Sequence, residues 1–482
     1  MNTKGHSGYG LRRRCLSFPE VLGQSIAGIS PTSTSVLVVA LVFASAGNGT
    51  WLVYLLATIG LLLVGLQINQ FGKRSASPGA FFVYVGQALG PSVGFICGWS
   101  LLLAYILSSA AALCAAVNFT SVLLTTMHIS VHALVWYTIA AVLIWYVAYR
   151  DIRLSANLML LLETVSIALV LILGVFVFIR RPSVIDWPQF QLNGIQYDGV
   201  RLGLVLAIFS YTGFESATAL GEEAKRPLVH IPRAVLLSPV ISGILFMFFS
   251  YVEILGFRGL PVPLDQSSAP INDLASSIGL SSIGMVITFG GIISLLACAL
   301  GSVNAASRIM LRMGRHGVLH NQLGVAHQQN ETPHYATTIS AILMFLISVI
   351  PTLRGIPALD VTSATGTIAT FGFLLAYILV SIAAPVYLRS VGELRPRHIL
   401  VATASLLFLL IPTVATFYPV PAPPADTFPL FFAAYMLAGI TWFAWLRLTS
   451  SRLVERIRKD IKFDCAVPVS RDSEVDSQHN SV

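Results

Sequence analysis

The residues most able to do chemistry in this chain lie in the stretch Phe209-Ser-Tyr-Thr-Gly-Phe-Glu215, which begins inside an apolar run long enough to enter a bilayer. A carboxylate at membrane depth costs at least ~2.5–3.5 kcal/mol on insertion scales, so it normally faces a cavity or a partner. Ser210, Thr212 and Gly213 weaken a helix at the same place. Irregular backbone at this depth is tolerated only where it lines a cavity or packs in protein. The pattern therefore indicates that this stretch belongs to a pathway through the membrane and is not a simple membrane anchor.

Composition places this stretch in a polytopic membrane protein. Of the 482 residues, 55% are hydrophobic and 10% are charged, with a mean hydropathy of +0.79. A soluble domain has about 25% charged residues, so that class is excluded. The net charge of +8 comes from basic residues in short loops and near the chain ends, which indicates membrane topology and not nucleic-acid binding. The five cysteines show no disulfide or metal spacing, and the basic N-terminus predicts a retained first span, not a cleaved signal peptide.

A window of ~19 residues finds twelve apolar segments and predicts an all-α protein with twelve transmembrane helices. The segments are residues 20–43, 51–70, 91–124, 132–149, 155–179, 202–221, 233–256, 283–310, 335–351, 362–388, 398–418 and 428–447. The third segment is too long for one perpendicular span, so we expect it to tilt, with residues 77–91 as a re-entrant or interfacial lead-in.

Charge bias gives the orientation. Twelve spans put 24 of the 29 Lys and Arg residues on the side of both termini and five on the other side, namely Arg180, Arg181, Arg201, Arg258 and Arg354. Basic residues favour the cytoplasmic side, so we expect a multi-pass protein of the inner or plasma membrane with both termini cytoplasmic.

Two predicted helices are interrupted at corresponding positions. The first carries Ile26-Ala-Gly-Ile-Ser-Pro-Thr-Ser-Thr-Ser35, in which Pro31 removes an amide donor. The sixth carries the break before Glu215. Paired interruptions in two halves indicate a binding site at the membrane midplane, where helix N-termini suit a carboxylate and free carbonyls suit a cation. A zwitterion fits such a site. The alternative is a simple proline kink in the first helix and a structural glutamate in the sixth.

These residues also resemble a known family. The segment from Phe209 to Pro227, with Ile231-Pro-Arg233, resembles the signature of the amino acid–polyamine–organocation superfamily. Asn304-Ala-Ala-Ser-Arg308 and Pro78-Gly79-Ala80 are similar to its eighth helix and the entrance to its third. The resemblance implies a LeuT-like fold. Its predicted parts are a tail (residues 1–17), two inverted five-helix repeats (18–179 and 200–390), two extra helices (398–447) and a second tail (448–482).

The resemblance implies a secondary transporter of amino acids or related amines and suggests where its substrate binds. In relatives, amides of a glycine-rich break in the first helix bind the substrate carboxylate, and carbonyls of the sixth helix receive the amino group. The matching stretch here has Pro and hydroxyl residues in place of glycines. Phe209 matches a gating aromatic, and Glu215 matches the family glutamate beside the break, so the resemblance makes both of them candidates for coupling or gating. The candidate substrate-binding residues are Ser30, Thr32, Ser33, Thr34, Phe209, Ser210, Tyr211, Thr212 and Gly213.

Glu163 is a candidate coupling residue. Several relatives carry a lysine at what resembles this position, where its ammonium stands in for a sodium ion, so the sign of the charge is reversed here. Glu163 could carry a proton or help bind a cation; alternatively, it only holds the fifth helix by hydrogen bonds. Sodium coupling stays open, since Ser294, Ser302 and Ser307 offer hydroxyls. For Glu253, near one end of the seventh helix, we expect a rim or structural role.

Two further acids follow the sixth helix. Glu222 and Glu223 stand beside Lys225 and Arg226, so we expect ion pairs among these neighbours on the cytoplasmic side. Surface pairs of this kind are worth only ~0–1 kcal/mol.

We therefore predict a permease that works by alternating access, with proton-coupled symport preferred. An exchanger, a polyamine transporter and a substrate-sensing receptor that does not transport are the alternatives. We expect no enzyme activity, no metal site and no cofactor besides the coupling ion. The expected partners are a small amino acid or amine and the lipid bilayer; the oligomeric state and the substrate's identity stay open.

Overall fold

The computed structural model describes residues 9–449 except 127, 130, 182, 268–269 and 419–422, together with residues 455 and 457. Residues 1–8 and most of the predicted tail 448–482 lie outside the described part. Within that part the protein is helical, and the one β-type contact is an isolated parallel bridge between Leu16 and Ala224.

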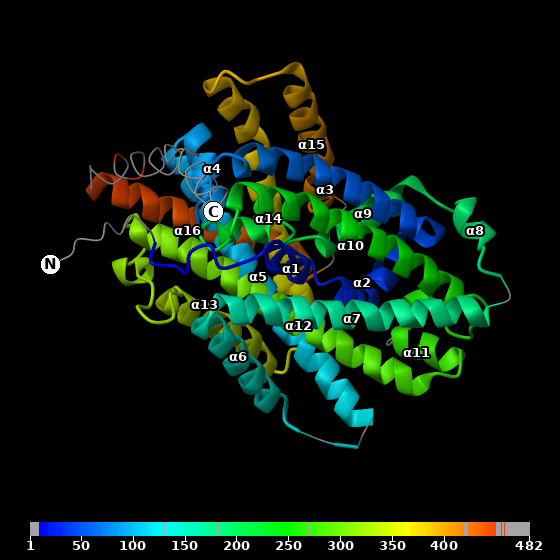
Figure 1. Ribbon diagram of the computed structural model, residues 1–482. Coiled ribbons are helices and arrows are strands. Elements are labelled where there is room, and N and C mark those ends of the chain that lie inside the picture. The colour runs from blue at the N-terminus through cyan, green and yellow to red at the C-terminus, as the bar shows by residue number, and fades with distance from the viewer. Residues whose placement is uncertain are drawn as a thin grey trace, which may run out of the picture.

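The long helices follow the predicted apolar segments (Figure 1). Their bounds are α1 (Phe18–Ile29), α2 (Pro31–Ala46), α3 (Thr50–Gly72), α5 (Pro91–Thr126), α6 (Ala133–Arg150), α7 (Ile152–Arg180), α9 (Tyr197–Ser210), α10 (Pro227–Phe257), α12 (Ser281–Arg315), α13 (His334–Leu353), α14 (Ala358–Ser390), α15 (Pro396–Ala415) and α16 (Phe428–Thr449). The shorter elements are η1 (Gly47–Gly49), α4 (Ala80–Leu89), α8 (Trp187–Phe190), η2 (Ser216–Leu220), η3 (Leu264–Gln266), α11 (Pro270–Ser277), η4 (Asn321–Gly324) and η5 (Ala425–Thr427).

Ten stretches of the described residues are long and apolar enough to cross a membrane. The first of them, Phe18–Gly72, contains 55 residues and includes α1, α2 and α3. α9 has only 14 residues and is not among the ten. The class of all-helical, multi-pass membrane protein is therefore established.

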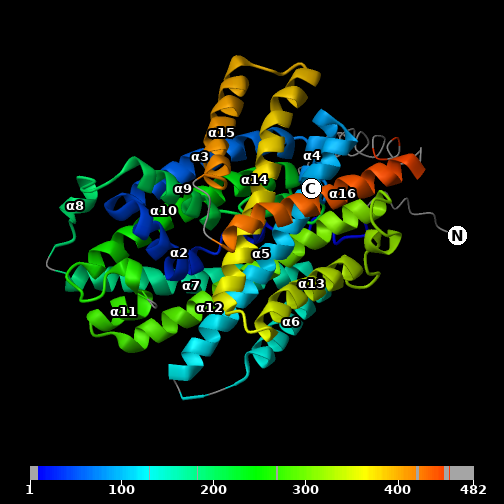
Figure 2. The ribbon, with the colours of Figure 1, turned by 180° about the vertical axis from the view of Figure 1, so that it is seen from behind.

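The predicted third segment is a single long helix with a separate lead-in. α5 runs for 36 residues, and Gly90, with φ 94°, separates it from α4. Only glycine adopts that backbone conformation readily, so the chain turns there instead of continuing one helix. α5 packs against α14 and α12 near the centre of the bundle, whereas α15 and α16 lie at the periphery (Figures 1 and 2).

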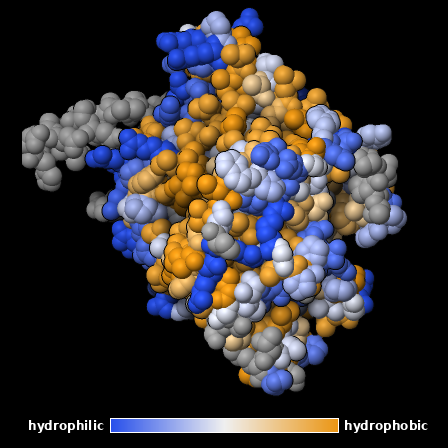
Figure 3. All heavy atoms as spheres, turned by 90° about the vertical axis from the view of Figure 1, so that its right-hand side faces the viewer, coloured by the Kyte–Doolittle hydropathy of each residue, from blue (hydrophilic) through white to orange (hydrophobic). Residues whose placement is uncertain are grey.

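The bundle has a polar region at each of two opposite ends. We call the end formed by residues 9–17, 222–226 and 316–333 the basic end, and the end formed by residues 183–196 the α8 end; they lie at the left and right of Figure 1. Figure 3 views the α8 end and shows extensive apolar surface beside scattered polar groups. Exposed leucines and isoleucines on α7, α15 and α16 fit contact with lipid tails.

Candidate functional site

The first break separates α1 from α2 at Ser30. Ser30 is left-handed, with φ 52° and ψ 68°, and Pro31 is the first residue of α2. Proline suits that position because the first amides of a helix have no partner within it. The local sequence therefore ends one helix and starts another without a long loop.

The second break follows Ser210, where α9 ends. Residues 211–215 form turns, and Gly213 has φ 93°. A short 3-10 helix, η2, follows from Ser216. The run of Ser, Tyr, Thr and Gly thus interrupts the helix at the place where the sequence predicted an interruption.

The two breaks touch each other. A Cβ added to Gly28 would lie 2.7 Å from the carbonyl oxygen of Gly213, and one added to Gly213 would lie 3.0 Å from the carbonyl oxygen of Gly28. Ser216 Oγ donates to the carbonyl of Gln24 at 3.1 Å, and the amide of Ala217 donates to Ser25 Oγ at 3.2 Å. Two interrupted segments almost 200 residues apart therefore meet inside the protein with their irregular backbone in contact.

Of the first-break candidates at the start of α2, Ser30, Thr32 and Thr34 are buried and Ser33 is half-buried. Ser33 Oγ donates to the carbonyl of Ser30 at 2.8 Å, and the amide of Thr34 donates to the same carbonyl at 3.3 Å. The Thr32 side chain is fully buried, and its hydroxyl has no hydrogen-bond partner in the described structure. An unpaired buried hydroxyl at a helix N-terminus is an available donor for an anion.

Several hydrogen-bonding groups of the second-break candidates already bond to other parts of the protein. Thr212 donates to the Phe209 carbonyl twice, from its amide at 3.2 Å and from its hydroxyl at 2.8 Å. The Tyr211 hydroxyl lies 2.7 Å from Thr58 Oγ1 on α3 and donates to the Tyr54 carbonyl. Ser210 Oγ donates back along α9 to the Leu206 carbonyl. The sequence did not indicate this internal bonding, which depends on α3 packing beside the break.

The Phe209 ring lies against α14. A Cβ on Gly366 would be 2.8 Å from the tip of the ring. This contact joins the end of α9 to the wall formed by α14, and only a residue without a side chain leaves room for it at position 366.

Glu163 is linked to the first break through one serine. Its side chain is buried on α7, and its two carboxyl oxygens lie 2.9 and 3.0 Å from Ser294 Oγ on α12. Ser294 Oγ in turn lies 2.7 Å from Ser30 Oγ. Among the three candidate serines on this helix, Ser294 is therefore the one that joins Glu163 to the break. Ser307 instead donates to the carbonyl of Asn304 on its own helix. The chain of contacts from α7 through α12 to Ser30 joins a titratable group to the break.

Glu215 and Glu253 differ in their bonding. Glu215 is fully buried and accepts hydrogen bonds from Tyr105 of α5 at 2.7 Å and Tyr377 of α14 at 2.5 Å. These bonds hold the turn after α9 against two other helices. Glu253 of α10 is equally buried, but neither of its carboxyl oxygens has a hydrogen-bond partner among the described residues. The two tyrosines are hydrogen-bond partners of Glu215 that sequence patterns did not reveal.

At the basic end, the chain's beginning packs over the loop after η2. The amides of Cys15 and Leu16 donate to the Glu223 carbonyl, and the Lys225 amide donates to Leu16. The Glu223 side chain is fully buried and accepts from Arg308 Nε at 2.9 Å. The expectation that Glu223 pairs with its basic neighbours in the sequence was wrong, because helix packing brings Arg308 of α12 to it from 85 positions away.

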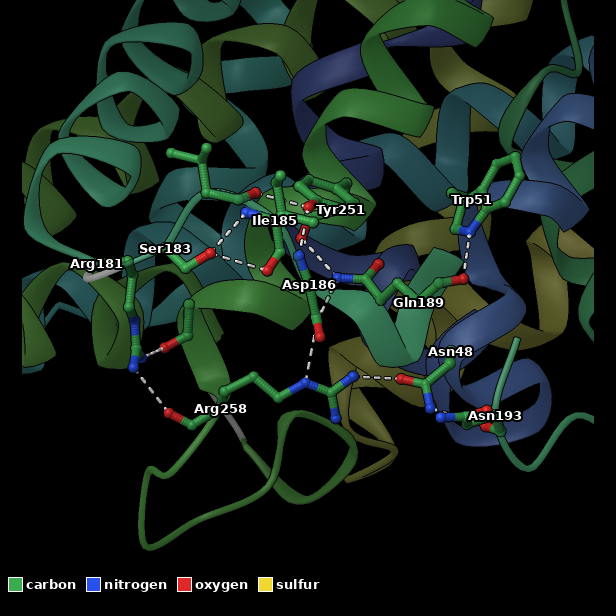
Figure 4. Close-up of polar contacts among 12 residues, drawn as sticks. Asn48, Trp51, Arg181, Ser183, Ile185, Asp186, Gln189, Asn193, Tyr251 and Arg258 are labelled. Carbon is green, nitrogen blue, oxygen red and sulfur yellow. Dashed lines mark hydrogen bonds and ion pairs between the residues drawn. The ribbon is translucent and has the colours of Figure 1, made fainter. Parts of the chain in front are cut away.

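The α8 end carries a second polar cluster, shown in Figure 4. We call it the α8-end cluster; its members are Asn48, Trp51, Asp186, Gln189, Tyr251 and Arg258. Asp186 accepts from Gln189 Nε2 at 2.8 Å and from Arg258 Nε at 3.0 Å. Arg258 also donates to Asn48, and Trp51 donates to the Gln189 carbonyl at 3.1 Å. The scarcity of basic residues at this end was the one sequence signal that could have drawn attention to Arg258.

No group of three or more His, Cys, Asp or Glu residues suited to a metal ion is found in the described part of the chain. The candidate site is formed by two helix breaks in contact, and one buried acid, Glu163, reaches the first break through Ser294. A group of polar contacts lies at each end of the bundle.

Comparison with known proteins shows the family. Residues 20–454 match the family model for amino acid permeases. The chain belongs to the amino acid permease family. This finding confirms the resemblance to the amino acid–polyamine–organocation superfamily predicted from the sequence.

The relatives of this permease act on several kinds of substrate. The branched-chain amino acid permease BcaP of Bacillus subtilis is 22% identical over 368 residues, which cover 70% of this chain and 73% of the relative. The low-affinity putrescine importer PlaP of Escherichia coli is 26% identical over 341 residues, 68% of this chain and 71% of the relative. Cationic amino acid transporter 4 of Mus musculus is 24% identical over 387 residues, 76% of this chain and 60% of the relative. Family membership therefore leaves the substrate of this permease open.

Proposed function

We propose that this permease moves amino acids or related amines across a membrane by alternating access, with proton-coupled symport as its mode. The observation that carries the proposal is the contact between the breaks at Gly28 and Gly213. Broken helices that meet at depth supply amides and carbonyls where a substrate can bind, which continuous helices do not.

The architecture we propose has twelve spans. α1 and α2 form one interrupted span, and α9 and η2 form another. Residues 18–179 and 200–390 then form two inverted five-helix repeats, and α15 and α16 are the two extra helices. The excess of basic residues at the basic end supports a cytoplasmic location for that end and for both termini.

The substrate site we propose lies between the two breaks. A substrate carboxylate fits the start of α2, where the Thr32 hydroxyl has no partner and the helix dipole favours negative charge. The amino group fits the turn after α9. Because the Phe209 carbonyl already accepts two bonds, the Thr212 carbonyl, which accepts no backbone amide among the described residues, is the better acceptor there.

Proton coupling would run through Glu163, Ser294 and Ser30. When Glu163 is ionised, Ser294 can only donate to it, and Ser30 then donates to Ser294. When Glu163 is protonated, it can donate to Ser294, which is then free to donate to Ser30. Gain of one proton therefore reverses the hydrogen bonds that end at the first break, where substrate would bind.

The test is uptake by proteoliposomes of pooled radiolabelled amino acids and polyamines, with and without an inward proton gradient. We expect the gradient to drive accumulation of one substrate class. Glu163→Gln should abolish this accumulation and spare counterflow exchange, because the amide replaces the acid's donor but cannot release a proton. Glu393→Gln, which alters an exposed pair with Arg74, is the matched control. Intact gradient-driven accumulation in Glu163→Gln would end the coupling proposal.

Other outcomes separate the alternatives. Uptake only into preloaded vesicles indicates an exchanger, and accumulation driven by sodium alone indicates sodium coupling. Binding without uptake indicates a sensor.

A neutral amino acid is the first candidate substrate, and an amine with a second positive charge is the other. The unpartnered carboxyl of Glu253 is the reason for keeping the amine as the alternative, because a buried acid without a partner can be satisfied by a cationic ligand. If the amine is correct, Glu253→Gln weakens uptake of diamines more than uptake of neutral amino acids.

A further inference from the structure

A groove unrelated to the two breaks lies between α9 and α15. Its cavity has a volume of about 670 Å³ and is lined by the first turns of α9, by the last turns of α15 and by Tyr418 beyond it. The two helices pack side by side, with α15 crossing at the edge of the bundle (Figure 2). The groove therefore opens on the periphery of the protein, toward the α8 end.

The floor of the groove is apolar. Leu407, Leu410, Ile411 and Val414 recur at three- and four-residue spacing and so lie along one face of α15. Leu410 is 54% exposed and Val414 is 46% exposed. A hydrocarbon chain fits this surface, because within a membrane-spanning helix an exposed apolar stripe faces lipid tails.

The rim of the groove carries one charge of each sign. Arg201 Nη2 and Asp198 Oδ1 are 3.5 Å apart and form an i,i+3 ion pair on α9. The Asp198 side chain is 77% exposed, whereas that of Arg201 is 21% exposed, and its Nε atom is buried without a hydrogen-bond partner. The pair is too long for a good hydrogen bond, so the guanidinium keeps donors for a ligand.

Two tyrosines flank these charges. Tyr197 is 83% exposed and Tyr418 is 68% exposed, and both line the groove. Tyrosines are enriched where a membrane protein crosses from hydrocarbon to headgroups, because the ring is apolar and the hydroxyl is polar. The rim is thus built for the depth at which a phospholipid carries its phosphate.

We propose that this groove binds one zwitterionic phospholipid, phosphatidylethanolamine. Its phosphate lies on Arg201, its ammonium lies against Asp198, and one acyl chain lies along α15. Arginine suits phosphate because its planar fork of donors matches the phosphate oxygens. An anionic lipid without an ammonium would have only Arg201 to contact and would offer the Asp198 carboxylate no positive group. The pairing of both signs on one rim therefore favours the zwitterion.

The test is native mass spectrometry of the detergent-purified full chain, titrated with phosphatidylethanolamine or phosphatidylglycerol of identical acyl chains. We expect the first lipid to be retained about fivefold more than the second, since the added ion pair between the lipid ammonium and the exposed Asp198 carboxylate contributes up to ~1 kcal/mol, which is about a fivefold change in affinity. Arg201→Gln should lose retention of both lipids. Asp198→Asn should lose the preference and keep the binding. Arg354→Gln, which removes an exposed arginine remote from the groove in sequence, is the control and should change nothing.

Equal or better retention of phosphatidylglycerol by the unaltered protein would overturn the proposal, as would unchanged retention in Arg201→Gln. Leu410→Trp provides a second route, because it fills the apolar floor and leaves both charges in place. Loss of bound lipid in this variant, with an unchanged elution profile, supports the groove as the site; unchanged retention contradicts it. None of these readouts depends on transport, so their failure is distinguishable from failure of the proposed function.

Discussion

The two ends of the bundle are held by different kinds of polar contact. At the basic end, the ion pair between Glu223 and Arg308 is buried, with 0% and 2% of the side chains exposed. At the α8 end, the pair between Asp186 and Arg258 has one buried partner, with 5% and 39% of the side chains exposed. The basic end also has backbone hydrogen bonds between Leu16 and residues 223–225, whereas the α8 end depends mainly on side-chain contacts (Figure 4).

This difference predicts which end opens more easily. Separating a fully buried pair leaves uncompensated charge in a low-dielectric interior, and this costs far more than separating a pair that water already reaches. Under the proposed alternating access, we therefore expect the α8 end to open first and the basic end to hold the resting state.

The largest expected effect comes from Glu223→Gln. Loss of this carboxylate leaves Arg308 buried and unpaired, which costs about 3–5 kcal/mol in comparable cases. We expect a clear drop in the melting temperature of the purified protein, measured by size-exclusion chromatography after heating. Glu393→Gln, at an exposed pair, should cost only ~0–1 kcal/mol.

A double variant sharpens this prediction. Glu223→Leu with Arg308→Met removes both charges, so much of the lost stability should return. A double variant as unstable as Glu223→Gln would show that the basic end depends on the shape of these side chains and not on their charges.

An intermediate effect is expected from Asp186→Asn. The change weakens the hydrogen bonds that Gln189 and Arg258 donate to this side chain, which costs about 1–2 kcal/mol in total. This range is below the cost for a fully buried pair because water already reaches the half-exposed Arg258. Deuterium uptake by peptides within residues 183–196 should become about tenfold faster, while uptake by residues 9–17 should not change. Asp273→Asn, at an exposed serine contact near the same end, is the control. Faster exchange at both ends would break the proposed separation between them.

The smallest expected effect is a change in the reactivity of the Cys15 thiol, which lies at the basic end and can be used to measure whether that end is open. Burial, and then the nearby Glu223, raise the pKa of the Cys15 thiol to about 11. An open end would return the pKa toward ~8.5, so the closed state favours the protonated thiol and loses stability as pH rises from ~8.5 toward 11.

In a variant with the other four cysteines replaced by serine, alkylation of Cys15 should therefore be slow at pH 7.5 and rise steeply above pH 8.5. The Glu223→Gln background should raise the rate, and the Glu393→Gln background should not. A rate equal to that of a free thiol peptide at pH 7.5 would show that this end is open at rest.

Most of the helices could be predicted because each depends on local composition. Apolar runs predicted where the long helices lie, and Pro31 and Gly213 predicted where two of them break. The residues around these breaks were candidates for the same local reason. Their bonding could not be predicted: the Phe209 carbonyl is occupied by Thr212, and Tyr211 bonds to α3. Such contacts depend on how a turn is rotated relative to a helix far away in the sequence.

The sequence by itself determined the class of membrane protein, the extent of its helices and the places where two of them are interrupted. Helix formation and transfer into a bilayer respond to residues that are neighbours in the chain. Only the tertiary structure decided that the breaks meet at Gly28 and Gly213, that Glu163 reaches Ser30 through Ser294, and that Glu223 pairs with Arg308. These partners lie tens to hundreds of positions apart, and a buried polar group takes whichever partner the packing of whole helices brings to it.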